Sequence, residues 1–281
     1  MPRGKGKRER WERNKGLACV HEPDLNGVTR GDTYLRGEWA REIFRSSVPI
    51  TLELGCGQGL FAVDLARRHP DRSFVGIDVK GHRFWRRAAA ADRAELSNIA
   101  FLRARVQWLD RFFGASEVRE IWLTFTDPQI GDKRGTKRLT SPYYLRLYQE
   151  ALEIGGRVLV KTDSPEFFER TVEDGPRAGL TVVDACTDVH GAESGRFDDE
   201  LEESLSFITA YEERWLREGR RVRFVALEKT QEVPGELLTE AKAMLQGPMS
   251  RDRPRFLGSP HSRGTSSSWG EGVKLSEERR G

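Results

Sequence analysis

The sequence predicts an α/β fold with a doubly wound, mostly parallel sheet of seven strands, one of them antiparallel. From Pro49 onward, short apolar runs alternate with amphipathic stretches, which is the pattern of a parallel sheet covered by helices. Runs such as 73–77 are almost continuously apolar, as expected of strands buried on both faces. An acidic stretch and a helix separate the last two runs, so we expect the final strand to return antiparallel.

The seven expected strands and the helices between them follow in chain order. The apolar runs predict strands at 51–54, 73–77, 99–103, 120–125, 157–161, 180–186 and 222–227. Helical spacing of apolar residues predicts helices at 60–68, 82–96, 142–152, 165–173 and 209–216. The segment 188–203 is acidic and is expected only to connect the last two strands.

The chain divides into four expected regions. We expect a basic N-terminal arm with a lead-in helix at 1–48, the sheet domain at 49–230, a short helix within 231–246, and a disordered basic Ser/Gly/Pro-rich tail at 247–281. No apolar run approaches 18 residues, and no apolar targeting segment follows the N-terminus, so we expect a cytoplasmic protein without a membrane span. The three cysteines lack metal-type spacing, so we expect no metal site.

The net charge of +3 hides an uneven distribution along the chain. Residues 1–15 contain seven basic and two acidic side chains, and residues 247–281 contain seven and four. The remaining segment therefore holds 33 basic and 38 acidic residues out of totals of 47 and 44. A further basic cluster, Lys133, Arg134, Lys137 and Arg138, lies inside the folded region. Basic arms on an acidic body predict a polyanionic partner, although a solvated terminus is the alternative.

A glycine loop follows the first expected strand. Gly55, Gly57 and Gly59 stand at alternate positions after Glu53, which lets the backbone turn tightly and approach a ligand closely. Asp78 ends the second strand, 23 residues after Gly55, where a carboxylate can accept both hydroxyls of a ribose. These five residues are therefore the candidate binding site for a nucleoside-containing cofactor.

The spacing of the glycines distinguishes between such cofactors. Dinucleotide enzymes use GxGxxG, in which a helix N-terminus receives a pyrophosphate. Here the pattern is ExGxGxG, and the Glu53 carboxylate would repel a pyrophosphate but suits an ammonium or sulfonium group. The sequence therefore favours S-adenosylmethionine over a nicotinamide cofactor or a ligand-free turn.

A second carboxylate, Asp127, follows the fourth expected strand, before Pro128. Ligands of open α/β sheets bind beyond the carboxyl ends of the strands, so Asp127 should face the cofactor's methyl group from the same edge as Glu53 and Asp78. The basic segment 133–138 follows directly. A carboxylate with cations beside it suits a nucleic-acid base as methyl acceptor, whereas an ordinary Asp-Pro turn is the plain alternative.

These motifs resemble the tRNA (guanine-N7-)-methyltransferases over about residues 22–228. The resemblance is carried by ELGCGQG at 53–59, FVGIDVKGHRFWR at 74–86, LTFTDPQ at 123–129, KRLTSPYYL at 137–145, VKTDS at 160–164 and TAYEERWLREG at 209–219. It implies a Rossmann-like methyltransferase fold and methyl transfer from S-adenosylmethionine to guanine N7 of tRNA, at the variable-loop guanine, position 46.

The resemblance also implies roles for individual residues. Glu53 and Asp78 would hold the cofactor, and Asp127 would be the catalytic carboxylate. Asp163, Thr209 and Glu212 would contact the substrate. The partner would be tRNA, and we expect a monomer or weak homodimer.

The chain departs from the family pattern at several positions. Thr126 and Gln129 stand where the family has Pro and Trp, Gly131 where it has a substrate lysine, and Arg105 where an acid commonly touches adenine. Lys133 can substitute for the lysine after a loop shift. Two alternatives stay open. The basic segment also fits a methyltransferase that acts on other RNA or on protein, and the departures at Thr126 and Gly131 suggest an RNA-binding protein that has lost catalysis.

Three aromatic residues are candidate stacking platforms for an unstacked base. They are Phe84, Trp85 and Trp11, although packing of a helix against the sheet is the favoured interpretation for the first two. Arg83, Arg86 and Arg87 lie on the same expected helix, where they can meet RNA phosphates or simply form a solvated face.

Overall fold

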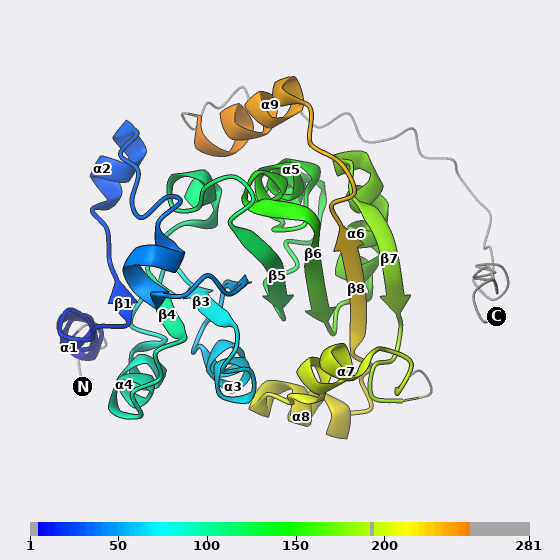
Figure 1. Cartoon of the computed structure of the whole chain (residues 1–281). Coiled ribbons are helices and arrows are strands. Elements are labelled where there is room, and N and C mark those ends of the chain that lie inside the picture. The colour runs from blue at the N-terminus through cyan, green and yellow to red at the C-terminus, as the bar shows by residue number, and fades with distance from the viewer. Residues whose placement is uncertain (1–4, 192–193, 248–281) are drawn as a thin grey trace, which may run out of the picture. The chain divides into compact units, whose positions relative to one another are not determined.

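A computed structural model of the chain describes residues 5–191 and 194–247, which contain one eight-stranded sheet (Figure 1). The strand order is β1-β4-β3-β2-β5-β6-β8-β7. The strands are β1 (Val20–His21), β2 (Ile50–Leu54), β3 (Ser73–Ile77), β4 (Ile99–Leu102), β5 (Val118–Thr124), β6 (Leu152–Thr162), β7 (Thr181–Cys186) and β8 (Arg223–Glu228). All seven expected strands are present. The expected number is one short, because the two-residue β1 adds an eighth strand beside β4.

The predicted mixture of strand directions is confirmed. β8 pairs antiparallel with both β6 and β7, and every other pairing is parallel. β2 lies between β3 and β5. From β2 the chain builds the sheet first to one side, through β3 and β4, and then to the other side, beginning with β5. In a doubly wound sheet, the carboxyl ends of the strands at this point form the ligand-binding crevice.

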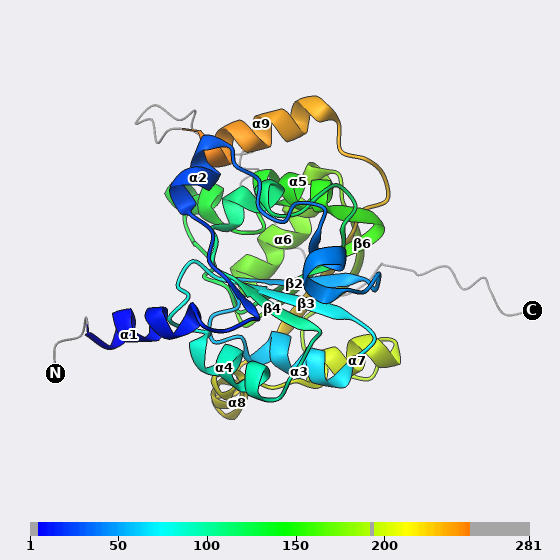
Figure 2. The same cartoon turned by 60° about the vertical axis from the view of Figure 1, so that its left-hand side comes forward.

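The helices cover both faces of the sheet (Figure 2). They are α1 (Lys5–Asn14), α2 (Leu25–Arg30), α3 (Leu60–Arg68), α4 (Trp85–Arg93), α5 (Pro142–Ala151), α6 (Pro165–Ala178), α7 (Asp199–Ser206), α8 (Ala210–Arg217) and α9 (Gly235–Gln246), with the shorter turns η1 (Trp39–Phe44), η2 (Val106–Arg111) and η3 (Asp132–Lys137). Apolar residues of α5, α6 and α9 belong to the core on one face. Those of α3, α4 and α7 belong to the core on the other face.

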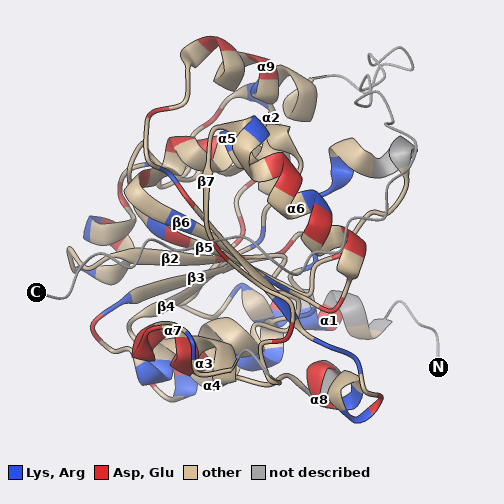
Figure 3. Ribbon diagram, turned by 90° about the vertical axis from the view of Figure 1, so that its right-hand side faces the viewer, with Lys and Arg blue, Asp and Glu red and all other residues tan. Residues whose placement is uncertain are grey.

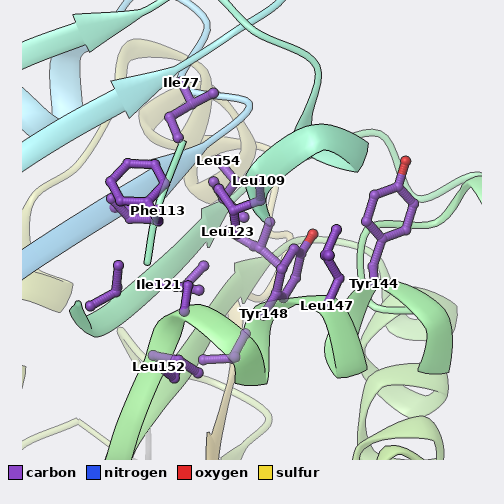
Figure 4. Close-up of a cluster of buried hydrophobic side chains, with 14 of the residues drawn as sticks. Leu54, Ile77, Leu109, Phe113, Ile121, Leu123, Tyr144, Leu147, Tyr148 and Leu152 are labelled. Carbon is purple, nitrogen blue, oxygen red and sulfur yellow. The ribbon is translucent and has the colours of Figure 1, made fainter. Parts of the chain in front are cut away.

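Side chains of alternate strand residues enter the two cores. On the face covered by α5, Tyr148 and Leu147 pack against Ile121 and Leu123 of β5 (Figure 4). On the opposite face Trp122, between those two β5 residues, packs against the Phe61 ring of α3, with ring centroids 4.9 Å apart. Burial on both faces explains why these strands are almost continuously apolar.

Tertiary contacts account for the differences in helix bounds. α6 continues to Ala178 past the expected end at residue 173, because Gly175 lets the helix pack closely on β8. A Cβ at Gly175 would lie 2.7 Å from Leu227 Cδ2. The acidic segment 188–203 contains the start of α7, which the expected pattern omits. Asp198 caps this helix by accepting a hydrogen bond from the Leu201 amide, and acidic residues colour much of its ribbon red (Figure 3).

The described residues of the expected arm and lead-in helix belong to the same compact unit as the sheet. Trp39 is fully buried and stacks on Phe113 with ring centroids 5.1 Å apart. α9, expected as a short helix, packs beside α5. The tail predicted to be disordered, 247–281, lies outside the described part of the chain except for Gly247, which is the C-cap of α9. No helix within residues 5–191 and 194–247 has the length and apolar character needed to cross a bilayer.

Candidate active site

The backbone of the glycine loop has the conformation that its sequence predicts. Gly55, Gly57 and Gly59 have φ angles of +72°, +55° and +70°, a region that side chains disfavour. Gly59 also caps α3, and a Cβ at this position would lie 2.4 Å from Cε1 of Phe101. The loop therefore leaves β2, turns tightly and starts α3 without bulky side chains.

Asp78 fastens the end of β3 to this loop. Its Oδ2 accepts a hydrogen bond from the Gly57 amide at 3.0 Å, and its Oδ1 accepts one from the Lys80 amide at 2.7 Å. The residue is only 6% exposed. Carboxylate oxygens retain further acceptor capacity when each makes one such bond. Asp78 can therefore bind hydroxyl groups of a ligand while holding the loop.

Glu53 is also buried and lies near the end of β2, before the loop. Its Oε1 accepts a hydrogen bond from the Thr124 hydroxyl at 2.7 Å, and its Oε2 accepts one from the Ala62 amide at 3.1 Å. Burial raises the pKa of Glu53 to about 7, and the charge of Asp78 adds to the rise, while the two hydrogen bonds oppose it. A cation bound beside this carboxyl group would favour its charged form.

Two cavities meet at the glycine loop. One, of about 520 Å³, is named here the Asp78 cavity and is lined by Asp78, Val79, Ala104, Arg105, Val106, Asp127 and their neighbours. The other, of about 670 Å³, is named the Glu53 cavity and is lined by Glu53, Gly57, His82, Trp85, Thr209, Trp215 and their neighbours. Gly55, Arg83 and Phe125 line both cavities. The site therefore offers two adjoining compartments at the carboxyl edge of the sheet.

Asp127 stands on a strained turn after β5. Phe125 and Gln129, on either side of it, have φ angles of +49° and +47°, which are uncommon for residues other than glycine. The Asp127 side chain is exposed, and its Oδ1 accepts a hydrogen bond from the Gln129 amide at 3.1 Å. Beside it, the buried Oγ1 of Thr126 has no hydrogen-bond partner within the described residues. The turn thus presents a carboxylate to the Asp78 cavity.

The residues implied to contact substrate occupy different environments. Thr209 is the N-cap of α8 and lines the Glu53 cavity. Asp163 follows β6 and forms an ion pair with Arg220 at 3.4 Å, and it lines neither of the two cavities. Glu212 is fully buried behind Thr209. Lys133 lies in η3, a few residues beyond Asp127.

Three further residues within the sequence motifs line the candidate site or lie behind its wall. Phe125 and Trp215 pack together with ring centroids 5.0 Å apart and form a wall of the Glu53 cavity. Lys161 is 1% exposed and forms an ion pair with Glu212 at 2.7 Å. A signal existed for Lys161, because an ionisable residue ends the apolar strand run 158–160.

The basic residues also divide by environment. Arg138 is mostly buried and forms an ion pair with buried Asp174 at 2.5 Å, so it fastens the basic segment to α6. Phe84 is fully buried and stacks on Phe101, which confirms the packing interpretation for that residue. Trp85 instead remains partly open on the rim of the Glu53 cavity.

Arginines from two helices surround the Trp85 ring. The guanidinium carbons of Arg13, Arg86 and Arg10 lie 5.4, 5.7 and 6.0 Å from its centroid. Arg10 and Arg13 belong to α1, which packs beside α4. The basic N-terminal segment is therefore helical from Lys5 and lies against the rim of the site.

Comparison with known proteins gives concordant results. A family model described as a putative methyltransferase matches residues 47–225. The tRNA (guanine-N(7)-)-methyltransferase of Porphyromonas gingivalis is 42% identical over 192 residues, which are 68% of this chain and 76% of that protein. The protein of the same name from Bacteroides fragilis is 37% identical over 234 residues, which are 83% and 89% of the two chains.

A solved structure supports the fold. The crystal structure of the 16S rRNA methyltransferase KamB aligns with a TM-score of 0.51 and 20% identity, covering 69% of this chain and 94% of KamB. This likeness concerns the arrangement of strands and helices, and confirms the predicted Rossmann-like methyltransferase fold.

Proposed function

Because the chain belongs to the family of tRNA (guanine-N(7)-)-methyltransferases, we propose that it transfers a methyl group from S-adenosylmethionine to N7 of a guanine in tRNA. The target we propose is the variable-loop guanine, position 46, and the reaction would take place in the cytoplasm. The observation that carries the proposal is that Asp78 and Asp127, from the ends of two different strands, line one cavity beside the glycine loop.

The residues of the site fit the proposed cofactor. Asp78 would accept the ribose hydroxyls, and Ala104 and Val106 offer an apolar wall to an adenine ring. Glu53 and the open backbone at Gly55 suit the cationic end of the molecule, which carries an ammonium and a sulfonium group. When bound, S-adenosylmethionine supplies an electrophilic methyl group. The site therefore needs to orient the acceptor and does not need to activate it by deprotonation.

Asp127 is the group that would orient the acceptor. Guanine N7 has a free lone pair at neutral pH, so positioning alone can supply much of the rate enhancement. An exposed carboxylate can accept hydrogen bonds from guanine N1–H and from the exocyclic amine. Adenine presents an acceptor at the corresponding edge and would be rejected. The negative charge would also stabilise the cationic base that forms.

The surroundings of the Glu53 cavity suit RNA. Arg10, Arg83 and Arg86 line this cavity together with Trp85 and Trp215. Arginines can pair with phosphates, and aromatic rings can stack on an unstacked base. The proposed path of the tRNA therefore runs over α1 and α4 toward Asp127.

An assay of Asp127→Asn tests the function. Wild-type protein is incubated with labelled S-adenosylmethionine and bulk tRNA, and the tRNA is then cleaved chemically at 7-methylguanine. For the wild type we expect cleavage at the variable loop. For Asp127→Asn we expect turnover to fall at least about a hundredfold, because the NH2 group of the asparagine would face the N–H donors of guanine in place of an acceptor. Affinity for S-adenosylmethionine, measured by calorimetry, should change little. Asp71→Asn, at an exposed carboxylate on the opposite edge of the sheet, is the matched control.

The same assay separates the alternatives. Label without cleavage at 7-methylguanine would indicate a methyltransferase with another acceptor. Binding of tRNA without any label would indicate an RNA-binding protein that has lost catalysis. Near-normal turnover of Asp127→Asn would refute the assigned role of Asp127.

A further inference from the structure

We propose that Lys161 is a positioning residue for the methyl-transfer site, and that Glu212 acts through it and not by touching the substrate. This inference rests on the proposed function. The motif resemblance implies that Glu212 contacts substrate, yet its side chain is fully buried. In the structure its partners are Lys161, His190 and the Thr209 amide.

Lys161 ends the buried part of β6 and has all three of its N–H donors occupied. Its Nζ lies 2.7 Å from Glu212 Oε1, 2.8 Å from the Leu205 carbonyl oxygen and 3.0 Å from the Phe207 carbonyl oxygen. The last two acceptors belong to the C-terminal end of α7, where the helix dipole favours a cation. The side chain is 1% exposed, so water cannot replace these partners.

Glu212 links the same cation to the start of α8. Its Oε2 accepts a hydrogen bond from the Thr209 amide at 3.2 Å, while the Thr209 hydroxyl accepts one from the Glu212 amide at 3.1 Å, so the two residues form a capping box. Glu212 Oε1 also lies 2.7 Å from Nε2 of His190. One buried carboxylate thereby joins β6, the β7–α7 connection and α8.

These contacts determine the position of the cavity wall. The Phe125 amide donates a hydrogen bond to the Lys161 carbonyl oxygen at 2.8 Å, and the Phe125 ring centroid lies 5.9 Å from Lys161 Nζ. Phe125 in turn packs on Trp215 of α8 at 5.0 Å. Thr209, Phe125 and Trp215 all line the Glu53 cavity, and Phe125 stands two residues before Asp127. Lys161 therefore holds both the Phe125 side and the α8 side of the Glu53 cavity without lining it.

The chain contains a matched control. Lys229 is also 1% exposed, its Nζ lies 2.9 Å from Glu232 and 2.8 Å from the Leu152 carbonyl oxygen, and it lies at the opposite end of β6. Lys161→Met and Lys229→Met both remove a buried ammonium group. Only the first should disturb the methyl-transfer site.

The experiment compares these two variants with Glu212→Gln and the double variant Lys161→Met/Glu212→Gln, at a temperature where all are folded. We expect kcat for tRNA methylation to fall at least about tenfold in Lys161→Met and in Glu212→Gln, since small displacements of positioning groups are costly. The double variant should lose no more than the worse single one, because both act through one contact. Affinity for S-adenosylmethionine should stay within about twofold, and Lys229→Met should retain the wild-type kcat.

A second readout does not depend on activity. This readout is the quenching of Trp215 fluorescence by acrylamide. The Trp215 signal is obtained by subtracting the fluorescence of the same protein carrying Trp215→Phe. Quenching should increase in Lys161→Met but not in Lys229→Met. If Lys161→Met does not fold, His190→Leu replaces it, because that partly exposed residue can be removed without leaving Lys161 unpaired, and its kcat should fall severalfold.

The outcomes separate the two proposals. A wild-type protein that methylates no tRNA overturns the proposed function, and the quenching comparison then still tests the positioning role. Equal kcat in Lys161→Met and Lys229→Met would overturn the positioning role, as would unchanged Trp215 quenching or additive losses in the double variant.

Discussion

Replacing Glu53 by Gln should make the protein more stable at alkaline pH and impair its binding of cofactor. Burial raises the pKa of Glu53 from 4.5 to about 7, so the folded protein keeps a proton that the unfolded chain loses. The resulting stabilisation is complete below about pH 4.5 and is lost as the pH rises through about 7. The glutamine side chain of Glu53→Gln stays neutral, and can keep both hydrogen bonds if its amide donates to the Thr124 hydroxyl and its carbonyl accepts from Ala62.

The size of the effect follows from the two pKa values of Glu53. Their difference of about 2.5 corresponds to about 3 kcal/mol of unfolding free energy once both states are ionised. The wild type loses about 2.5 kcal/mol of this unfolding free energy between pH 5 and pH 8. The stability of Glu53→Gln relative to the wild type should therefore increase by about that amount over this interval. Its affinity for S-adenosylmethionine should fall about tenfold, because a neutral amide attracts a cation less strongly than a carboxylate does.

Urea unfolding at pH 5 and pH 8 measures the change in stability, and calorimetry measures the cofactor affinity. Glu173→Gln, at an exposed carboxylate on α6, is the control and should show no such dependence on pH. If the difference in unfolding free energy between Glu53→Gln and the wild type is the same at both pH values, the raised pKa of Glu53 is refuted. If cofactor affinity is unchanged, Glu53 does not contribute to the cofactor site.

Three further predictions concern the loop, the basic segment and the rim. Gly59→Ala should lose about 3 kcal/mol of unfolding free energy in thermal unfolding, because it adds a left-handed backbone penalty to a clash with Phe101. Arg138→Met should lose about 3 kcal/mol by the same measurement, because it removes an ion-pair partner of the buried Asp174. Trp85→Ala should weaken tRNA binding about tenfold in filter-binding assays and leave cofactor affinity unchanged.

Neighbouring residues supply controls for these predictions. Gly57→Ala shares the left-handed backbone but has its nearest atom 3.9 Å from the added Cβ, so it should cost about 1 kcal/mol. Lys137→Met, at an exposed position, should leave stability nearly unchanged. If Gly57→Ala and Gly59→Ala lost the same unfolding free energy, the close contact of Gly59 with Phe101 would be contradicted. If Lys137→Met and Arg138→Met lost the same unfolding free energy, the stabilising ion pair of Arg138 with Asp174 would be contradicted. An unchanged tRNA affinity of Trp85→Ala would remove α4 from the proposed RNA path.

The sequence predicts the sheet well because its strands are buried on both faces. Such strands need apolar residues at every position, and the run 73–77 is visible without any structure. The two residues of β1 carry no comparable pattern, since they pair only along the edge of β4. α7 is hidden for another reason: its first turn is acidic, which looks like a solvated charge run but suits the positive end of a helix.

The sequence predicts the site residues well where the backbone conformation requires a particular residue. It predicts them less well where their role depends on which side chains pack together. Gly55 and Gly59 are fixed by φ angles that other residues disfavour, so their spacing in the sequence is informative. Glu212 illustrates the limit. A motif reveals that a carboxylate stands there, but only the fold shows that Lys161, 51 positions earlier, faces it in the core.

The three carboxylates at the carboxyl edge of the sheet differ in surroundings, and that difference divides their proposed roles. Asp78 is held by two backbone amides, so it is preorganised to accept hydroxyl groups. Glu53 is buried with a raised pKa, so its charge depends on a neighbouring cation. Asp127 is exposed on a strained turn, where a base can reach it without displacing protein partners from a core. A carboxylate buried at position 127 would be out of reach of such a base. The turn in which Phe125 and Gln129 have positive φ angles therefore holds the Asp127 carboxylate outside the core, where its proposed role requires it.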